Sequence, residues 1–296
     1  MTENVEQVEN LQPDSNEEEV AVKISGDSSY QPEFTIREML EAGVHFGHKT
    51  ARWNSKMQPY IYGIKNELHI IDLGQTAPLM TDAVRTLREI VKRRGKILFV
   101  CTKKQGAEVV KKVAEENGQY YVTNKWLGGM LTNWKTISKS IKTLNEAEKE
   151  LVNENSLLTK KEKVDLSKKQ EKLVKQLGGI RNMQKLPNII FVIDTPREEL
   201  AVTEARSLGI PVMAITDTNS DPLLINYPIP GNDDSIKAIE LYMRIIDDAL
   251  KSVKDYISTT EEEKKGGGDR PASKKTSKSF LKRDVRPSKK EETSAE

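Results

Sequence analysis

The pattern of apolar and polar positions alternates between two kinds of segment along the middle of the chain. Short apolar runs without polar alternation, typical of buried parallel strands, occur at residues 96–101, 188–193 and 210–216. Apolar residues at helical spacing fill four other segments, residues 76–94, 107–117, 198–208 and 235–254. Strands alternating with helices predict an α/β fold, with a central parallel sheet covered on both faces.

Local signals add shorter elements. Residues 60–62 and 68–71 predict two strands around a polar turn, and residues 120–122 predict another after Gly118, which ends a helix. Thr35 and Glu38 have capping-box spacing, so we expect a short helix to begin there.

One segment, from residue 136 to about 183, interrupts the alternation because it is rich in Lys and Glu. Its sparse apolar positions follow a narrow stripe, including Ile137, Ile141, Leu144, Leu151, Leu166, Leu173, Leu177 and Ile180. Thr159 and Glu162 form a second capping-box spacing between the two halves. This pattern predicts an inserted antiparallel coiled-coil hairpin. A pair of surface helices lying flat on the sheet is the alternative.

Charge divides the chain into three parts that a net charge of +2 conceals. Residues 1–33 carry nine acids and one base, residues 34–260 carry 35 bases and 28 acids, and residues 261–296 carry 11 bases and 8 acids. We therefore predict an acidic disordered head (1–33), a folded domain (34–257) and a disordered Lys-rich tail (258–296). The basic body suits a polyanionic partner, although a solvated surface would also account for it.

Targeting and redox signals point to the cytoplasm. The single cysteine, Cys101, cannot form an internal disulfide, which fits a reducing compartment. The acidic N-terminus has no apolar core of a signal peptide, and no apolar stretch reaches the length of a membrane span. We expect no membrane partner.

The densest cluster of chemically active residues is loop one, residues 45–54. It holds the predicted RNA-binding residues His45, His48, Lys49, Arg52, Trp53 and Asn54. Cationic groups pair with phosphates, amide and imidazole groups bond bases or 2′-hydroxyls, and indole rings stack on bases. Burial of Trp53 and structural roles for the histidines are the alternatives. We predict no metal, because His69 is the one further imidazole and no cysteine lies nearby.

A second candidate segment, loop two, covers residues 123–135 around Gly128 and Gly129. Its predicted RNA-binding residues are Lys125, Asn133, Trp134 and Lys135, while Leu127, Met130 and Leu131 are expected to pack. Lys103 and Lys104 are added because they follow a strand, where α/β sheets usually bind ligands.

Acidic residues at strand ends support a rival hypothesis. Asp194, Asp217 and Asp221 could serve a nucleotide- or sugar-phosphate-binding enzyme with a metal or a ribose. Neither phosphate-loop pattern, G-x-G-x-x-G or G-x-x-x-x-G-K-[ST], accompanies them. The structural alternative is that Asp217 and Asn219 form turns and that Asp233 or Asp234 caps the final helix.

Long stretches of the chain resemble the bacterial small-subunit ribosomal protein S2 family. They are MLEAGVHFGHKTARWNSKMQPYIYG (39–63), HIIDL (69–73), TKKQ (102–105), NKWLGGMLTNWKTI (124–137), LPNIIFVID (186–194), and LGIPVMAITDTNSDP with IPGNDD (208–234). The resemblance covers residues 34–255 in the family's order. It does not reach the acidic head or the Lys-rich tail.

The resemblance implies a flavodoxin-like, Rossmann-like three-layer sandwich with a protruding coiled-coil hairpin. It also implies a structural component of the small ribosomal subunit that supports translation, with no enzymatic activity, cofactor or small-molecule substrate. The implied partners are small-subunit ribosomal RNA and other small-subunit ribosomal proteins, including ribosomal protein S1. By the same implication, the acidic cluster is structural.

Overall fold

A computed structural model describes residues 30–153 and 159–266 of the chain. The chain divides into two units, residues 1–257 and 258–296. Most of the predicted acidic head and Lys-rich tail, residues 1–29 and 267–296, lies outside the described residues. None of the described helices is both long enough and apolar enough to cross a membrane.

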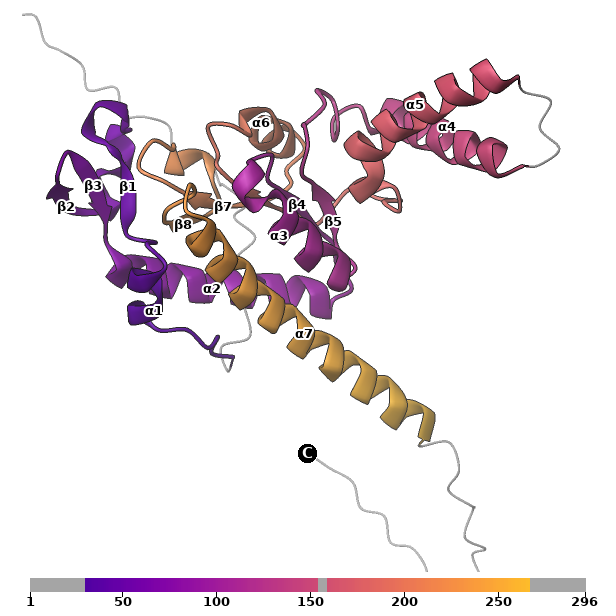
Figure 1. Ribbon diagram of the computed structural model, residues 1–296. Helices are drawn as coiled ribbons and strands as arrows, with labels where there is room; N and C mark the ends of the chain where they lie inside the picture. Colours follow the sequence, from indigo (N-terminus) through magenta and orange to yellow (C-terminus); the bar gives the residue numbers. More distant parts are fainter. Residues whose placement is uncertain (1–29, 154–158, 267–296) are drawn as a thin grey trace, which may run out of the picture. The chain divides into compact units, whose positions relative to one another are not determined.

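A parallel sheet of five strands forms the centre of the first unit (Figure 1). The strands are β4 (Ile97–Val100), β5 (Tyr120–Val122), β6 (Ile189–Ile193), β7 (Val212–Thr216) and β8 (Tyr227–Pro230). Their order, β5-β4-β6-β7-β8, is that of the flavodoxin-like fold. As the continuous apolar runs predicted, every residue of β4, β6 and β7 is buried.

Helices cover both faces of this sheet, and each face has its own apolar cluster. One cluster joins one side of the strands, including Phe99 and Phe191, to α2 (Leu73–Lys92), α3 (Lys104–Glu116) and α7 (Ile236–Gly266). The opposite cluster joins the other side, including Leu98 and Val192, to α6 (Glu199–Ser207) and to the first and last turns of the inserted helices. The α/β prediction with a doubly covered parallel sheet is therefore confirmed.

A second, antiparallel sheet precedes α2 and has the order β1-β3-β2. It consists of β1 (Phe46–Lys49), β2 (Ile61–Lys65) and β3 (Leu68–Ile71). The sequence predicted the second and third of these strands but not β1, which lies inside loop one. The capping box of Thr35 and Glu38 is present at the start of α1 (Ile36–Glu41).

The inserted segment forms two helices that lie side by side, α4 (Trp134–Val152) and α5 (Lys160–Leu177) (Figure 1). The predicted capping box of Thr159 and Glu162 begins α5. Arg181, beyond the end of α5, binds Glu148 of α4 through its guanidinium group at 2.5 and 3.0 Å. The apolar stripe is buried where α4 leaves the body, at Ile137, Ile141 and Leu144. Coiled-coil packing along the rest of the pair stays a prediction.

Three details at the C-terminal side of the fold differ from the sequence prediction. Strand β8 was not predicted, and its two prolines are tolerated because it is an edge strand. Ser235, not Asp233 or Asp234, caps α7, since its hydroxyl accepts from the backbone N–H of Ala238 at 3.4 Å. Helix α7 continues to Gly266 and so extends into the segment where the sequence predicted the tail to begin, at residue 258.

Candidate nucleic-acid interface

Loop one presents its cationic and aromatic side chains to solvent. Lys49 ends β1, and the short 3-10 helix η1 (Thr50–Arg52) follows it. The side chains of Lys49 and Arg52 are exposed. Trp53 is 40% exposed, and the underside of its ring lies 4.9 Å from the ring of the buried His69. Burial does not account for Trp53, because much of the indole remains available for stacking. His45 and Asn54 are half-buried.

Thr218, which is buried just after β7, holds loop one on the central sheet. Its hydroxyl accepts from the backbone N–H of His48 at 2.9 Å, and its carbonyl accepts from the backbone N–H of Asn54 at 2.8 Å. A Cβ atom at Gly47 would lie 2.6 Å from the Thr218 methyl group, so only glycine permits this approach. Between these two points, Lys49 pairs with Leu68 across the small sheet, and the side chains of Lys49 and Arg52 are exposed.

Glu204 of α6 fixes the conformation of loop two by accepting hydrogen bonds from it. Its Oε1 accepts from the indole of Trp126 at 3.0 Å and the backbone N–H of Gly129 at 2.7 Å. Its Oε2 accepts from the backbone N–H groups of Leu131 at 2.9 Å and Thr132 at 3.1 Å. Burial alone would raise the pKa of Glu204, but these donors outweigh burial and hold it below its ordinary value.

The buried residues of loop two determine which of its other side chains face solvent. Met130 and Leu131 are almost completely buried, as predicted. Trp134 begins α4 and packs partly against the second apolar cluster. Lys125, Asn133 and Lys135 are exposed. Loop two is therefore a rigid turn with cations on its outer side.

All these segments lie at the carboxyl edge of the parallel sheet, where ligands of flavodoxin-like folds bind. Loop one rests on the residue after β7, Lys104 begins the helix after β4, and loop two follows β5. Strands are spaced about 4.8 Å apart, so β5 and β7 are separated by roughly 14 Å. The structure thus brings both loops to one edge, at different positions along it.

Five exposed cations on this edge have no acidic partner among the described residues: Lys49, Arg52, Lys104, Lys125 and Lys135. Their charges are not neutralised within the folded part of the chain, so they are available to an external anion.

Lys103 does not belong with these cations, although the sequence grouped it with Lys104. Its ammonium group is buried and lies 2.7 Å from carboxylate oxygens of Asp233 and Asp234 and 3.0 Å from Asp194. Burial alone would lower the pKa of Lys103, but these carboxylates raise it strongly. Lys103 is a structural counter-ion and cannot reach an external phosphate from this position.

His48 is also directed inward, toward Asp217 and Asp234. Its Nδ1 lies 3.0 Å from Asp217 Oδ2, and its Nε2 lies 3.5 Å from Asp234 Oδ2. The hydrogen bond to Asp217 raises the pKa of His48. Burial and the charge of Asp217 raise the pKa of Asp233 to about 7. We call Lys103, His48, Asp194, Asp217, Asp233 and Asp234 the charge cluster.

The acids of the rival enzyme hypothesis do not form one site. Asp194 and Asp217 belong to the charge cluster. Asp221 instead binds Lys56 at 2.6 Å and caps the short 3-10 helix η4 (Pro222–Leu224). The chain turns after Asp217, whose carbonyl accepts from the backbone N–H of Ser220 at 2.9 Å. The Asp217 carboxylate, however, accepts from the hydroxyl and N–H of the adjacent Thr218 and not from the residue two positions on, as an Asx turn requires. The acids therefore act as internal counter-ions and caps.

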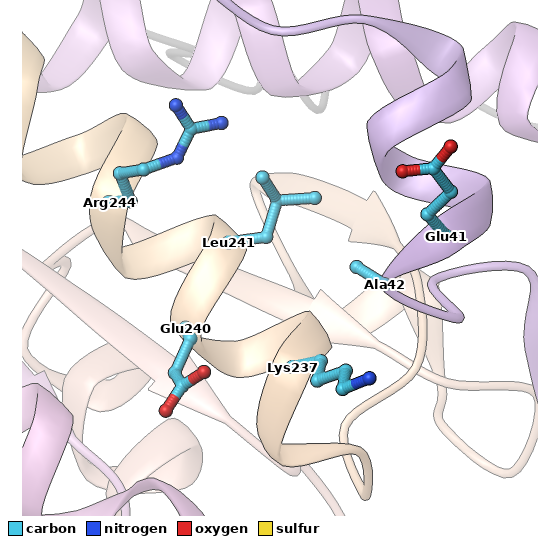
Figure 2. A pocket seen from close by; sticks show the side chains of 6 residues that line it. All are labelled: Glu41, Ala42, Lys237, Glu240, Leu241 and Arg244. Atoms are coloured by element: carbon cyan, nitrogen blue, oxygen red, sulfur yellow. The ribbon is translucent and has the colours of Figure 1, made fainter.

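A surface hollow of about 460 Å³ lies between α1 and α7 (Figure 2). Glu41 and Ala42 at the end of α1 form one wall, and Lys237, Glu240, Leu241 and Arg244 of α7 form the other. None of the predicted site residues lines it, and it contributes nothing to the interface.

Two residues essential to this geometry, Glu204 and Thr218, were not among the sequence candidates. Glu204 looks like an ordinary helical glutamate, and no local signal separates it from Glu199. Thr218 lies in a polar stretch after a strand, which signalled a turn but not a support for loop one.

The family model and the similar known proteins agree on one family. The model of the family described as "Ribosomal protein S2" matches residues 39–252. A protein of Granulibacter bethesdensis named "Small ribosomal subunit protein uS2" is 53% identical over 219 residues, covering 74% of this chain and 85% of the relative. A protein of the same name from Rickettsia felis is 56% identical over 220 residues, covering 74% and 75%.

Proposed function

The chain belongs to the ribosomal protein S2 family, and on that basis we propose that it is a non-enzymatic structural component of the small ribosomal subunit. In this role it binds ribosomal RNA and neighbouring ribosomal proteins and supports translation. The relatives' name states their place in the small subunit.

The observation that carries the RNA-binding part is the set of unpaired cations at one edge of the sheet. Lys49, Arg52 and Trp53 are all exposed within loop one, so one short loop offers both phosphate neutralisation and base stacking. Loop two carries the same residue types, with exposed Lys125 and Lys135 and the half-buried Trp134. An RNA surface has the matching chemistry, because it presents both phosphates and unstacked bases.

We assign the proposed contact to ten residues, His45, Lys49, Arg52, Trp53, Asn54, Lys104, Lys125, Asn133, Trp134 and Lys135. His48 and Lys103 are left out because the charge cluster engages both side chains. The cations supply affinity that depends on salt, whereas the indoles and amides supply contacts to bases.

Reversing the charge of Lys49 and Arg52 together to Glu is expected to weaken binding to small-subunit RNA by at least roughly tenfold at physiological salt. The reason is that two phosphate contacts are replaced by repulsion. The slope of log affinity against log salt should fall in magnitude by about 1 to 2, since each contact contributes about 0.7 to 0.9. Filter binding at several salt concentrations measures both quantities.

The matched control reverses Lys111 and Lys112 to Glu, two exposed cations of α3. It changes the net charge equally but lies outside both loops. An equal loss in both variants would show that only overall charge matters, and unchanged binding in the loop-one variant would exclude loop one as a contact.

We further propose that the inserted helices act as an arm for protein partners. Val152 and Val164 are exposed near its far end and offer apolar contacts among charged side chains. Coiled-coil packing would keep such an arm straight. Ribosomal protein S1 is among the proposed partners, because the motifs of this chain resemble a family that helps to recruit it.

Shortening the arm separates protein binding from RNA binding. Gln170 and Glu148 lie within 3.5 Å of each other through their side chains, so a short Gly-Asn turn can replace residues 149–169 and leave the packed base intact. We expect RNA affinity within about twofold of the full chain and loss of at least one ribosomal protein, measured by capture of purified small-subunit proteins, S1 included. Capture of an unchanged set would contradict the role of the arm.

A further inference from the structure

The turn that joins β6 to α6, residues 194–198, lies at the switch point of the parallel sheet. The crossover after β4 leads to β5 on one side, and the crossover after β6 leads to β7 on the other. Its backbone is also unusual, because Asp194 has a φ of 71°, which residues other than glycine seldom adopt. Switch points are where sheets of this type bind ligands, and strained backbone is concentrated at functional sites.

The contacts of this turn hold Arg197 in place. The carboxylate of Asp194 accepts from the backbone N–H of Arg197 at 3.1 Å. Glu198 is 2% exposed, and its Oε1 accepts from the backbone N–H of Thr102 at 2.9 Å and from its hydroxyl at 2.5 Å. Because the hydroxyl hydrogen is used in this way, Thr102 Oγ1 accepts from Arg197 Nε, at 2.8 Å. Thr102 follows β4, so the relay joins the two strands of the switch point.

The outer side of the Arg197 guanidinium remains available. The side chain is exposed, and no carboxylate within residues 30–153 and 159–266 forms an ion pair with it. Unlike the five exposed cations of this edge, it is tied to a buried acid, Glu198, through Thr102. Its two Nη groups therefore present an oriented fork of N–H donors, the geometry that matches two oxygens of one phosphate.

The acids beside the turn favour a phosphate within a nucleic-acid strand over a free one. Asp194 belongs to the turn itself, and Asp233 and Asp234 pair with Lys103, the neighbour of Thr102. A phosphate monoester carries about 1.5 to 2 negative charges at neutral pH, and these acids repel it strongly. A phosphodiester carries a single charge, and contacts on either side also hold its strand in place.

We propose that Arg197 binds a phosphate of an RNA strand that contacts loop one and loop two, and that Thr102 and Glu198 position its guanidinium. The inference rests on the proposed RNA-binding function and makes the two loops parts of one continuous track. Loop one rests on the residue after β7, and loop two follows β5. Strand spacing places β6 about 5 Å from β7 and about 10 Å from β5, so Arg197 fills the gap between the loops.

Arg197→Ala in the full-length chain is expected to weaken binding to small-subunit RNA by roughly five- to tenfold at physiological salt. The slope of log affinity against log salt should fall in magnitude by about 0.7 to 0.9. Arg197→Lys keeps the charge without the fork, and Thr102→Val keeps every charge but removes the hydroxyl that orients Arg197. Both should weaken binding by roughly two- to threefold and leave the slope unchanged. Filter binding at several salt concentrations measures these quantities.

The matched control is Arg206→Ala, which removes an exposed arginine from the last turn of α6. It changes the net charge equally and should alter affinity by less than about twofold. An equal loss in the Arg197 and Arg206 variants would overturn the proposal, since overall charge alone would then explain the effect. So would unchanged affinity in Arg197→Ala. If the loop-one variant still binds weakly in that case, the proposed function stands without Arg197, and if it too is unchanged, both fail.

Phosphate-ethylation interference on the bound RNA tests whether the track is continuous. The phosphate whose interference disappears in Arg197→Ala should lie between two other groups of phosphates in the same stretch of RNA. One group is lost when Lys49 and Arg52 are changed to Glu, and the other when Lys125 and Lys135 are changed to Glu. A phosphate outside that interval, or no lost phosphate, would contradict the assignment of Arg197 to the middle of the track.

Discussion

Replacing Glu204 by Ala is expected to lower the free energy of unfolding by about 3 to 5 kcal/mol, because several buried donors lose their shared acceptor at once. The substitution removes the acceptor for the Trp126 indole and for the backbone N–H groups of Gly129, Leu131 and Thr132. Each donor left unsatisfied in the interior costs about 1 to 3 kcal/mol, although these costs do not add fully. Urea unfolding measures the total, and amide hydrogen exchange at residues 129–132 shows whether loop two opens.

The control is Glu199→Ala, which removes an exposed carboxylate from the same helix. It should change stability by less than about 0.5 kcal/mol. Similar losses in both variants would show that the effect comes from α6 as a helix and that Glu204 has no special role in loop two.

The same network predicts how stability depends on pH. The pKa of Glu204 is lowered in the folded state, so its contribution is present above the unfolded value of about 4.3 and is lost as pH falls through the folded value. Glu204→Gln should therefore be less stable than wild type at pH 7, and the difference should narrow below about pH 4. A constant difference from pH 7 to pH 3 would contradict an ionised Glu204.

The sequence predicted the central sheet well because its strands are buried on both faces. Apolar runs as short and continuous as residues 188–193 and 210–216, in a chain that alternates strands with helices, are typical of central parallel strands. Strand β8 escaped prediction for the opposite reason. Pro228 and Pro230 argue against a strand unless it lies at an edge, and the position of a strand in the sheet is not a local property.

The limits of prediction from the sequence are clearest at the candidate interface. Lys103 and Lys104 are neighbours of the same type, yet one is buried in an ion cluster and the other is exposed. The difference depends on Asp194 and Asp233, which are far along the chain and arrive only when the sheet forms. The role of Glu204 was equally hidden from local patterns, since Glu204 lies 78 positions from its partner Trp126. Local patterns identified the loops, and long-range contacts decided which side chains face outward.

Replacing Lys103 by Met is expected to cost about 3 to 5 kcal/mol of stability, because it keeps the aliphatic packing but leaves buried carboxylates without their cation. Asp233 is completely buried and Asp194 is 8% exposed, so these two carboxylates cannot be solvated in place of the ammonium group without opening the fold. The measurement is urea unfolding at pH 7.

Two further variants separate charge from packing in this prediction. Lys104→Met, at the exposed neighbouring position, should change stability by less than about 0.5 kcal/mol. Adding Asp233→Asn to Lys103→Met should recover part of the loss, because the worst-placed unpaired charge is removed together with its partner. If the second substitution deepens the loss instead, Lys103 stabilises the fold mainly through its hydrocarbon contacts. Partial recovery would establish that the carboxyl edge is held together by an internal ion cluster, which leaves the exposed cations beside it free to neutralise an external partner.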